Sequence, residues 1–165
     1  MLFRQHSLVL LLLGLMASQV STASDSGHYL TLGLGHVAVF DSNIDDPYVY
    51  KLEYRFAPRT KWLLAPAIGA ARSGNGASFL FLDLEKDFFP GKHWVVTPSF
   101  GLGSFDDGKD VKLGHDLEFR SGIKVAYQFD NKVRLGIGLF HLSNGGLSDR
   151  NPGTEPMFLS LSFPF

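Results

Sequence analysis

The chain has 165 residues, with 15 basic and 16 acidic side chains and no cysteine. Its formal net charge of -1 gives no reason to expect a nucleic-acid partner. The lack of cysteine excludes disulfides and thiol catalysis. This length suits one domain with a sizeable core.

The first residues predict export. Arg4 precedes an apolar core from Leu8 to Met16, and Ser21-Thr22-Ala23 supplies the small residues of a cleavage site. We expect a signal peptide over residues 1–23 and a mature domain over residues 24–165. The apolar core is too short for a spanning helix, and no later apolar stretch reaches that length. A mature protein that crosses a membrane would therefore do so as a closed barrel, because only helices and barrels satisfy their backbone groups in lipid.

After Ser24 the apolar residues recur with period two, which is typical of strands. One early segment alternates apolar with charged residues: Tyr48, Tyr50, Leu52, Tyr54 and Phe56 against Val49, Lys51, Glu53 and Arg55. Alternation alone does not decide which face meets lipid. The charged side chains could lie on an exposed face or form a paired network that fills a narrow lumen.

Eight such segments follow one another, and an even number of this size predicts an all-β, eight-stranded antiparallel transmembrane β-barrel. They are Tyr29–Phe40, Tyr48–Phe56, Lys61–Arg72, Ala77–Phe88, His93–Ser104, Leu113–Phe129, Lys132–Ser143 and Glu155–Phe165. The connections alternate between longer ones (41–47, 73–76, 105–112 and 144–154) and tighter ones (58–60, 89–92 and 130–131), as in outer-membrane barrels. The alternation up to the terminal Phe165 resembles the C-terminal signature of such barrels, although Pro164 departs from a clean strand.

Three polar residues share the parity of the apolar face and are expected to point outward. His141 and Ser143 are two residues apart on one strand, about 6.6 Å along it, and Glu155 lies across the following hairpin. Taken singly, each suits an interfacial or solvated position. Together they predict a triad in which Ser143 attacks an ester, His141 transfers the proton and Glu155 orients the imidazole.

The run His141-Leu142-Ser143-Asn144, with Glu155 twelve positions beyond the serine, resembles the lipid A 3-O-deacylase (PagL) family. These are eight-stranded outer-membrane esterases with a Ser-His-Glu triad on the barrel exterior. The resemblance implies hydrolysis of the ester-linked 3-hydroxyacyl chain at position 3 of lipid A, with no cofactor and with lipopolysaccharide of the outer leaflet as the partner.

The same resemblance implies roles for the loop after Ser143. Gly146, through its backbone N–H, and Asn151, through its side-chain amide, match positions that stabilise the oxyanion, and Asn144 matches the Asn that follows the family's serine. For Gly145 and Gly153 we favour turn chemistry.

Other polar residues give weaker indications. His36, His93 and His115 have no ligand-like spacing with carboxylates, so no metal site is expected. Glycines inside the strands are interpreted as relieving crowding; they include Gly33, Gly35, Gly101, Gly103, Gly136 and Gly138. The acidic loop residues suit a phosphorylated glycolipid only if a divalent cation bridges them; they are Asp41, Asp45, Asp46, Asp106, Asp107 and Asp110.

Several alternatives stay open at this point. The chain could be a non-enzymatic structural or adhesive barrel, or an acyltransferase that acts on an outer-leaflet lipid. It could also be a soluble lipocalin-type carrier with its apolar residues inward. The sequence leaves a homodimer open.

Overall fold

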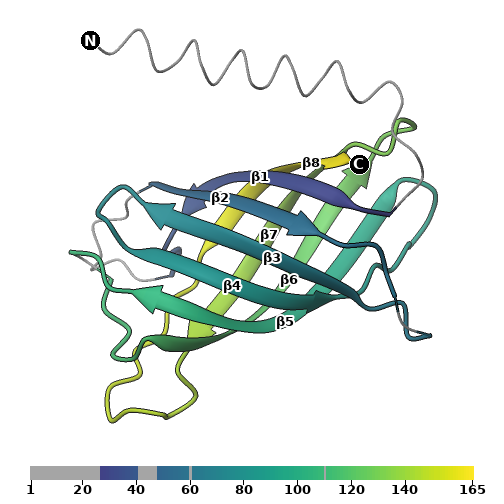
Figure 1. Cartoon of the computed structure of the whole chain (residues 1–165). Coiled ribbons are helices and arrows are strands. Elements are labelled where there is room, and N and C mark those ends of the chain that lie inside the picture. The colour runs from purple at the N-terminus through teal and green to yellow at the C-terminus, as the bar shows by residue number, and fades with distance from the viewer. Residues whose placement is uncertain (1–26, 41–47, 60, 110) are drawn as a thin grey trace, which may run out of the picture.

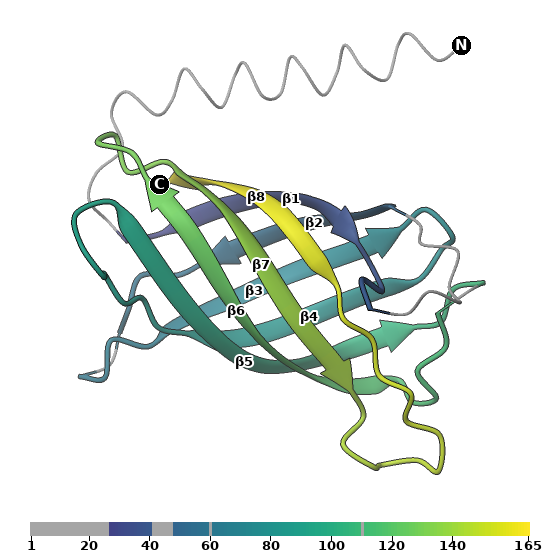
Figure 2. The same ribbon diagram turned by 180° about the vertical axis from the view of Figure 1, so that it is seen from behind.

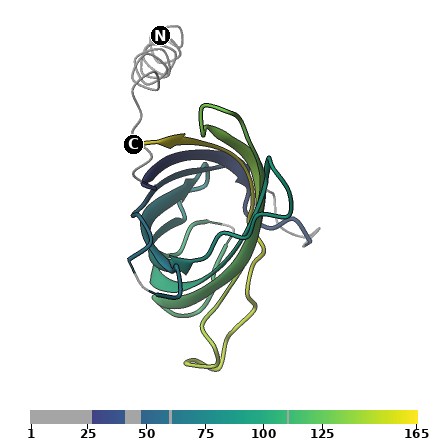
Figure 3. The same ribbon diagram turned by 90° about the vertical axis from the view of Figure 1, so that its right-hand side faces the viewer.

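A computed structural model describes residues 27–40, 48–59, 61–109 and 111–165. They form a closed antiparallel barrel in which each strand pairs with the next and β8 returns to β1 (Figures 1 and 3). This confirms the predicted eight-stranded fold. The strands are β1 (Tyr29–His36), β2 (Tyr48–Arg55), β3 (Ala65–Ser73), β4 (Ser78–Glu85), β5 (Trp94–Asp106), β6 (Leu117–Gln128), β7 (Arg134–Ser143) and β8 (Met157–Pro164).

The predicted signal peptide and four of the acidic loop residues, Asp41, Asp45, Asp46 and Asp110, lie outside the described ranges. Within those ranges, no helix is long and apolar enough to cross a membrane.

Several predicted boundaries were wrong. β3 begins at Ala65 rather than Lys61, because Leu63 has a left-handed φ of 57° that a strand does not accept. The connection before β3 is therefore longer than the tight turn predicted at 58–60, whereas the one after it, 74–77, has the predicted length and lies one residue later.

The starts of β6 and β8 also lie later than predicted. β6 begins at Leu117, and Leu113, expected on the outer face, is instead buried with 1% of its surface exposed. β8 begins at Met157, so Glu155 lies just ahead of it. A bridge between Leu142 and Thr154 keeps that segment beside β7.

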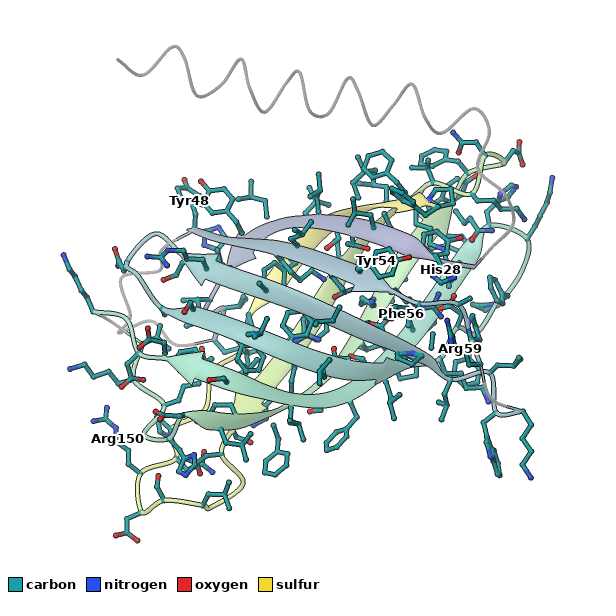
Figure 4. All side chains as sticks on the ribbon, in the orientation of Figure 1. His28, Tyr48, Tyr54, Phe56, Arg59 and Arg150 are labelled. Atoms are coloured by element: carbon teal, nitrogen blue, oxygen red, sulfur yellow. The ribbon has the colours of Figure 1, made fainter. Side chains whose placement is uncertain are left out.

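The barrel has two distinct ends. The backbone N–H of Phe165 donates to the carbonyl of His28 at 3.0 Å, so the C-terminus lies beside the start of β1. We call this the terminal end. The opposite end, here the loop end, carries the connections after β1, β3, β5 and β7, whose described residues are 37–40, 74–77, 107–109 with 111–116, and 144–156. Figure 4 shows His28, Tyr54, Phe56 and Arg59 toward the terminal end, and Tyr48 and Arg150 toward the loop end.

The apolar face of the strands points outward. Leu52 and Tyr50 are exposed, whereas Lys51 and Glu53 between and beside them are buried. The alternative of a soluble carrier with an apolar interior is therefore wrong. At the terminal end, aromatic side chains gather in two edge-on pairs, Tyr54 with Phe56 and Trp94 with Tyr127, as in the aromatic girdle of a membrane barrel.

Ion pairs fill the half of the lumen near the terminal end. Glu53 accepts hydrogen bonds from Lys51 and Lys124, both at 2.9 Å, and Lys124 also donates to Glu85. Closer to that end, Asp87 pairs with Arg134 at 2.8 Å and with Arg55 at 3.2 Å. Burial would raise the pKa of Asp87, but the two guanidinium groups outweigh it and lower that pKa.

Aromatic side chains fill the other half of the lumen. Phe79, Phe81, Phe140 and Phe158 belong to one buried cluster, and the Arg120 guanidinium carbon lies 3.6 Å from the centroid of the Phe140 ring. A Cβ on Gly122 would lie 2.2 Å from Phe140, so the ring fits only against a glycine. The predicted relief of crowding by glycines within strands is confirmed at Gly101, Gly103 and Gly136, where a Cβ would lie 2.1–2.5 Å from a backbone carbonyl oxygen of the neighbouring strand. Two internal cavities of about 30 and 40 Å³ each hold a few water molecules at most.

Candidate active site

His141 and Glu155 are direct neighbours across β7 and the segment that leads into β8. Leu142 and Thr154 exchange both of their backbone hydrogen bonds, at 2.9 and 3.0 Å. The next pair along the ladder, His141 with Glu155, is therefore a non-hydrogen-bonded pair, in which side chains approach most closely. The imidazole Nδ1 lies 3.0 Å from the Glu155 Oε1. The predicted approach of these two side chains is present in the structure.

Both side chains lie on the outer face of the barrel. His141 stands between the buried Phe140 and Leu142, and the side chains of His141 and Glu155 are 50% and 31% exposed. The backbone around Glu155 is also fixed, because its carbonyl accepts a hydrogen bond from the Val39 N–H at 3.1 Å. The Thr154 hydroxyl donates to the Val37 carbonyl at 2.7 Å. The residues after β1 thus hold the backbone at Thr154 and Glu155 in place.

Ser143 is the last residue of β7 and shares the outward parity of His141. Its side chain is half-buried. Because Nδ1 of His141 is bound to Glu155, Nε2 is the nitrogen left to receive the serine proton. Among the described residues, no hydrogen bond joins Ser143 to His141. Such contacts are often long before substrate binds.

Asn144 organises the loop that follows and is fully buried. Its amide nitrogen donates to the carbonyls of Arg150 at 2.8 Å and Leu113 at 3.2 Å, and lies 3.1 Å from the Ser148 hydroxyl. Its amide oxygen accepts the Gly146 N–H at 3.0 Å. These acceptors and this donor fix the orientation of the amide. The loop, which Figure 2 shows projecting from the barrel wall between β7 and β8, is therefore held together by one buried side chain.

Both predicted oxyanion donors, Gly146 and Asn151, are hydrogen-bonded to Asn144. The backbone N–H of Asn144 donates to the Asn151 side-chain oxygen at 3.0 Å, which leaves the Asn151 amide nitrogen as the donor end of that group. The Gly146 N–H is already bound to the Asn144 oxygen and would have to change partner to meet an oxyanion. The oxyanion roles of Asn151 and Gly146 stay predictions.

Gly153 lies against the edge of the imidazole. A Cβ at this position would lie 3.0 Å from Cε1 and 3.7 Å from Nε2 of His141, and 3.2 Å from the Leu142 carbonyl oxygen. Gly153 also has a left-handed φ of 70°, which suits glycine. Turn chemistry therefore explains the backbone of Gly153 only, because the missing side chain also leaves space beside Cε1 and Nε2 of His141.

Ser121 is a neighbour of His141 that the sequence reasoning missed. The register pairs it directly with His141 on the β6 side, and its side chain is exposed. The sequence does show that Ser121 is a polar residue with the outward parity of Phe119 and Ile123. Only the strand register shows that it lies beside His141.

The described ranges contain no group of three or more His, Asp or Glu side chains that could hold a metal ion. The chemistry available at this site is that of a nucleophile, a base and a carboxylate on a lipid-facing barrel wall.

The fold and this exterior site define a small β-barrel with a polar cluster of the hydrolase type on its outer face. The model of the lipid A 3-O-deacylase (PagL) family matches residues 48–164. The chain belongs to this family, and the family is one of outer-membrane ester hydrolases.

Solved structures show the same architecture. The crystal structure of the outer membrane enzyme PagL superposes with a TM-score of 0.67 at 18% identity, covering 83% of this chain and 99% of that one. Neisserial surface protein A gives a TM-score of 0.58 at 14% identity, with 85% and 98% covered. The Yersinia pestis outer membrane protein Ail gives 0.52 at 12% identity, with 84% and 99% covered. A search of curated proteins found no match. At these identities the structural likeness shows the fold alone.

Proposed function

We propose that this protein removes the ester-linked 3-hydroxyacyl chain at position 3 of lipid A, using Ser143, His141 and Glu155. The observation that carries the proposal is the His141–Glu155 pair, with 3.0 Å between Nδ1 and Oε1 on the outer face of the barrel. A polar pair on the lipid-facing surface costs free energy. Its presence there therefore indicates a function. The acyl esters of a membrane lipid lie at the same surface.

The reaction proceeds in two halves. The Ser143 Oγ attacks the ester carbonyl carbon while Nε2 of His141 takes the hydroxyl proton, and Glu155 stabilises the resulting imidazolium. Collapse of the tetrahedral intermediate breaks the bond to the sugar oxygen, which takes the proton from Nε2. Water then gives its proton to Nε2 and attacks the acyl-serine, releasing the 3-hydroxy fatty acid and restoring the Ser143 hydroxyl.

The Asn151 amide nitrogen supplies the main oxyanion donor, and Gly146 a second one once its N–H leaves the Asn144 oxygen. A donor aimed at the oxyanion contributes about 3–4 kcal/mol to transition-state stabilisation. Asn144 keeps both groups beside Ser143 through its hydrogen bonds. We place the loop end, and with it the site, at the outer leaflet after export and cleavage of the signal peptide. The homodimer stays a prediction.

Mass spectrometry of lipid A after incubation with the detergent-refolded protein tests the function, with Ser143→Ala run in parallel. We expect the unchanged protein to remove one 3-hydroxyacyl group, and the variant to fold but leave lipid A intact. No mass change with the folded wild-type protein would favour the non-enzymatic barrel. Transfer of the acyl group to a second lipid, without free fatty acid, would instead identify an acyltransferase.

A further inference from the structure

Ser121 faces outward on β6, directly beside His141. The β6–β7 register pairs the two residues, and both side chains are exposed. Since Phe140 and Leu142 direct their backbone N–H groups to the β8 side, His141 directs its own toward β6. Ser121 and His141 therefore form a hydrogen-bonded pair, with Cα atoms about 5.5 Å apart. The imidazole thus has Glu155 on one side and Ser121 on the other.

Ser121 is also flanked by larger apolar residues on the outer wall. Its neighbours on the same face are Phe119 and Ile123 along β6, and Phe100 across on β5. The Phe100 side chain is 61% exposed and that of Ile123 47% exposed, so both stand out from the wall. Ser121 therefore presents a hydroxyl between larger hydrocarbon side chains.

This hydroxyl needs a partner, because an unpaired hydroxyl in hydrocarbon is unfavourable. The side chains of Phe100, Phe119 and Ile123 carry no polar atom. His141 has Nδ1 bound to Glu155, and its Nε2 serves Ser143 in the proposed reaction. A polar group on the bound substrate can supply this partner.

We propose that Ser121 recognises the hydroxyl group on the third carbon of the acyl chain, which makes it a specificity-determining residue for 3-hydroxyacyl esters. This inference rests on the deacylase function proposed above. Ser121 and Ser143 are diagonal neighbours across β6 and β7, with Cβ atoms about 7–8 Å apart. An acyl group attached to Ser143 places its hydroxyl two carbon–carbon bonds beyond the carbonyl carbon. One hydrogen bond of about 2.8 Å then spans the rest of the distance to Ser121.

The experiment uses the full-length protein folded in detergent and two synthetic lipid A analogues. The analogues differ only in the position-3 chain, which is either 3-hydroxyacyl or an unsubstituted acyl chain of equal length. Fatty-acid release measured by mass spectrometry gives kcat/KM for each. We expect the wild-type protein to prefer the hydroxyacyl analogue by about tenfold, the effect of one hydrogen bond.

Three variants isolate the hydroxyl. Ser121→Ala should slow the hydroxyacyl reaction alone and abolish the preference, whereas Ser121→Thr, which keeps a hydroxyl, should retain it. Ser104→Ala is the matched control, because Ser104 is another exposed serine, on β5 and away from His141. We expect it to behave as wild type. Folding of each variant is checked by its heat-dependent gel mobility.

The outcomes separate this inference from the function on which it rests. Release of neither chain by the folded wild-type protein overturns the deacylase proposal and this one with it. Release with the same preference in wild type and Ser121→Ala overturns the role of Ser121 alone. Equal slowing of both analogues by Ser121→Ala also overturns it, because a merely structural serine would act in that way.

Discussion

Polar side chains occur in two regions of this barrel and are treated differently in each. Inside, Glu53 lies between two lysines and is 1% exposed, and the neighbouring carboxylates meet lysine or arginine. Outside, His141 and Glu155 form one pair on an apolar wall, with Ser143 and Ser121 beside the imidazole. These interior groups pair with one another, whereas the exterior groups keep hydrogen-bonding capacity for another molecule. Removing an interior group should therefore affect stability, and removing an exterior group should affect chemistry.

The largest expected effect comes from the exterior. His141→Asn removes the proposed base, and we expect activity toward lipid A to fall by about 10⁴-fold or more. The unfolding free energy should change by less than about 0.5 kcal/mol, because the side chain is half exposed. Rates of fatty-acid release and urea unfolding of the same preparation measure both quantities. Loss of folding in this variant would contradict the division between the two regions.

A change in the interior should lower stability and leave the rate of deacylation unchanged. Glu53→Ala leaves Lys51 and Lys124 buried without their shared carboxylate, and we expect the barrel to lose about 3–5 kcal/mol of stability. The fraction that still folds should keep its rate of deacylation. Glu155→Gln is the matched exterior control for stability and should unfold like the wild type in urea. Equal stability of Glu53→Ala and wild type would show that the lumen network contributes nothing to folding.

The third effect is smaller and concerns space at the imidazole. Gly153→Ala places a Cβ 3.0 Å from Cε1 of His141, so the imidazole must move. We expect this displacement to lower activity by about 10²-fold. Gly76→Ala is the control, because Gly76 also has a left-handed φ, of 99°, but would meet nothing within 4 Å. Both variants bear the backbone strain, so their difference in rate reports the contact with His141. Equal rates would show that Gly153 serves the turn alone.

The strand pattern predicted the barrel because period two is a property of neighbouring residues in the chain. Tyr50 and Lys51 already separate onto opposite faces by parity, and the structure then shows which face is the lumen. Leu113 shows where alternation fails to predict burial. It continues the parity of β6 but leaves the strand and becomes buried at the loop end, because packing rather than alternation decides its place.

The site was predictable to a similar extent. His141, Ser143 and Glu155 share an outward parity, and the chain brings the first and third together across a hairpin. Ser121 was not predictable, because its adjacency to His141 depends on the register between β6 and β7. The hydrogen bonds of Asn144 were equally hidden, since they join the loop after β7 to Leu113 in a loop far away in the chain.

The filled lumen has a consequence for the cell that carries this protein. Ion pairs occupy the half of the interior near the terminal end, and aromatic rings packed around the Arg120–Asp83 pair occupy the other half. Two of the cavities between these side chains, of about 30 and 40 Å³, suit only a few water molecules. Where the described strands are packed in this way, the interior leaves no open path for solutes the size of nutrients and antibiotics. Such a protein can be made in large amounts without weakening the permeability barrier in which it resides.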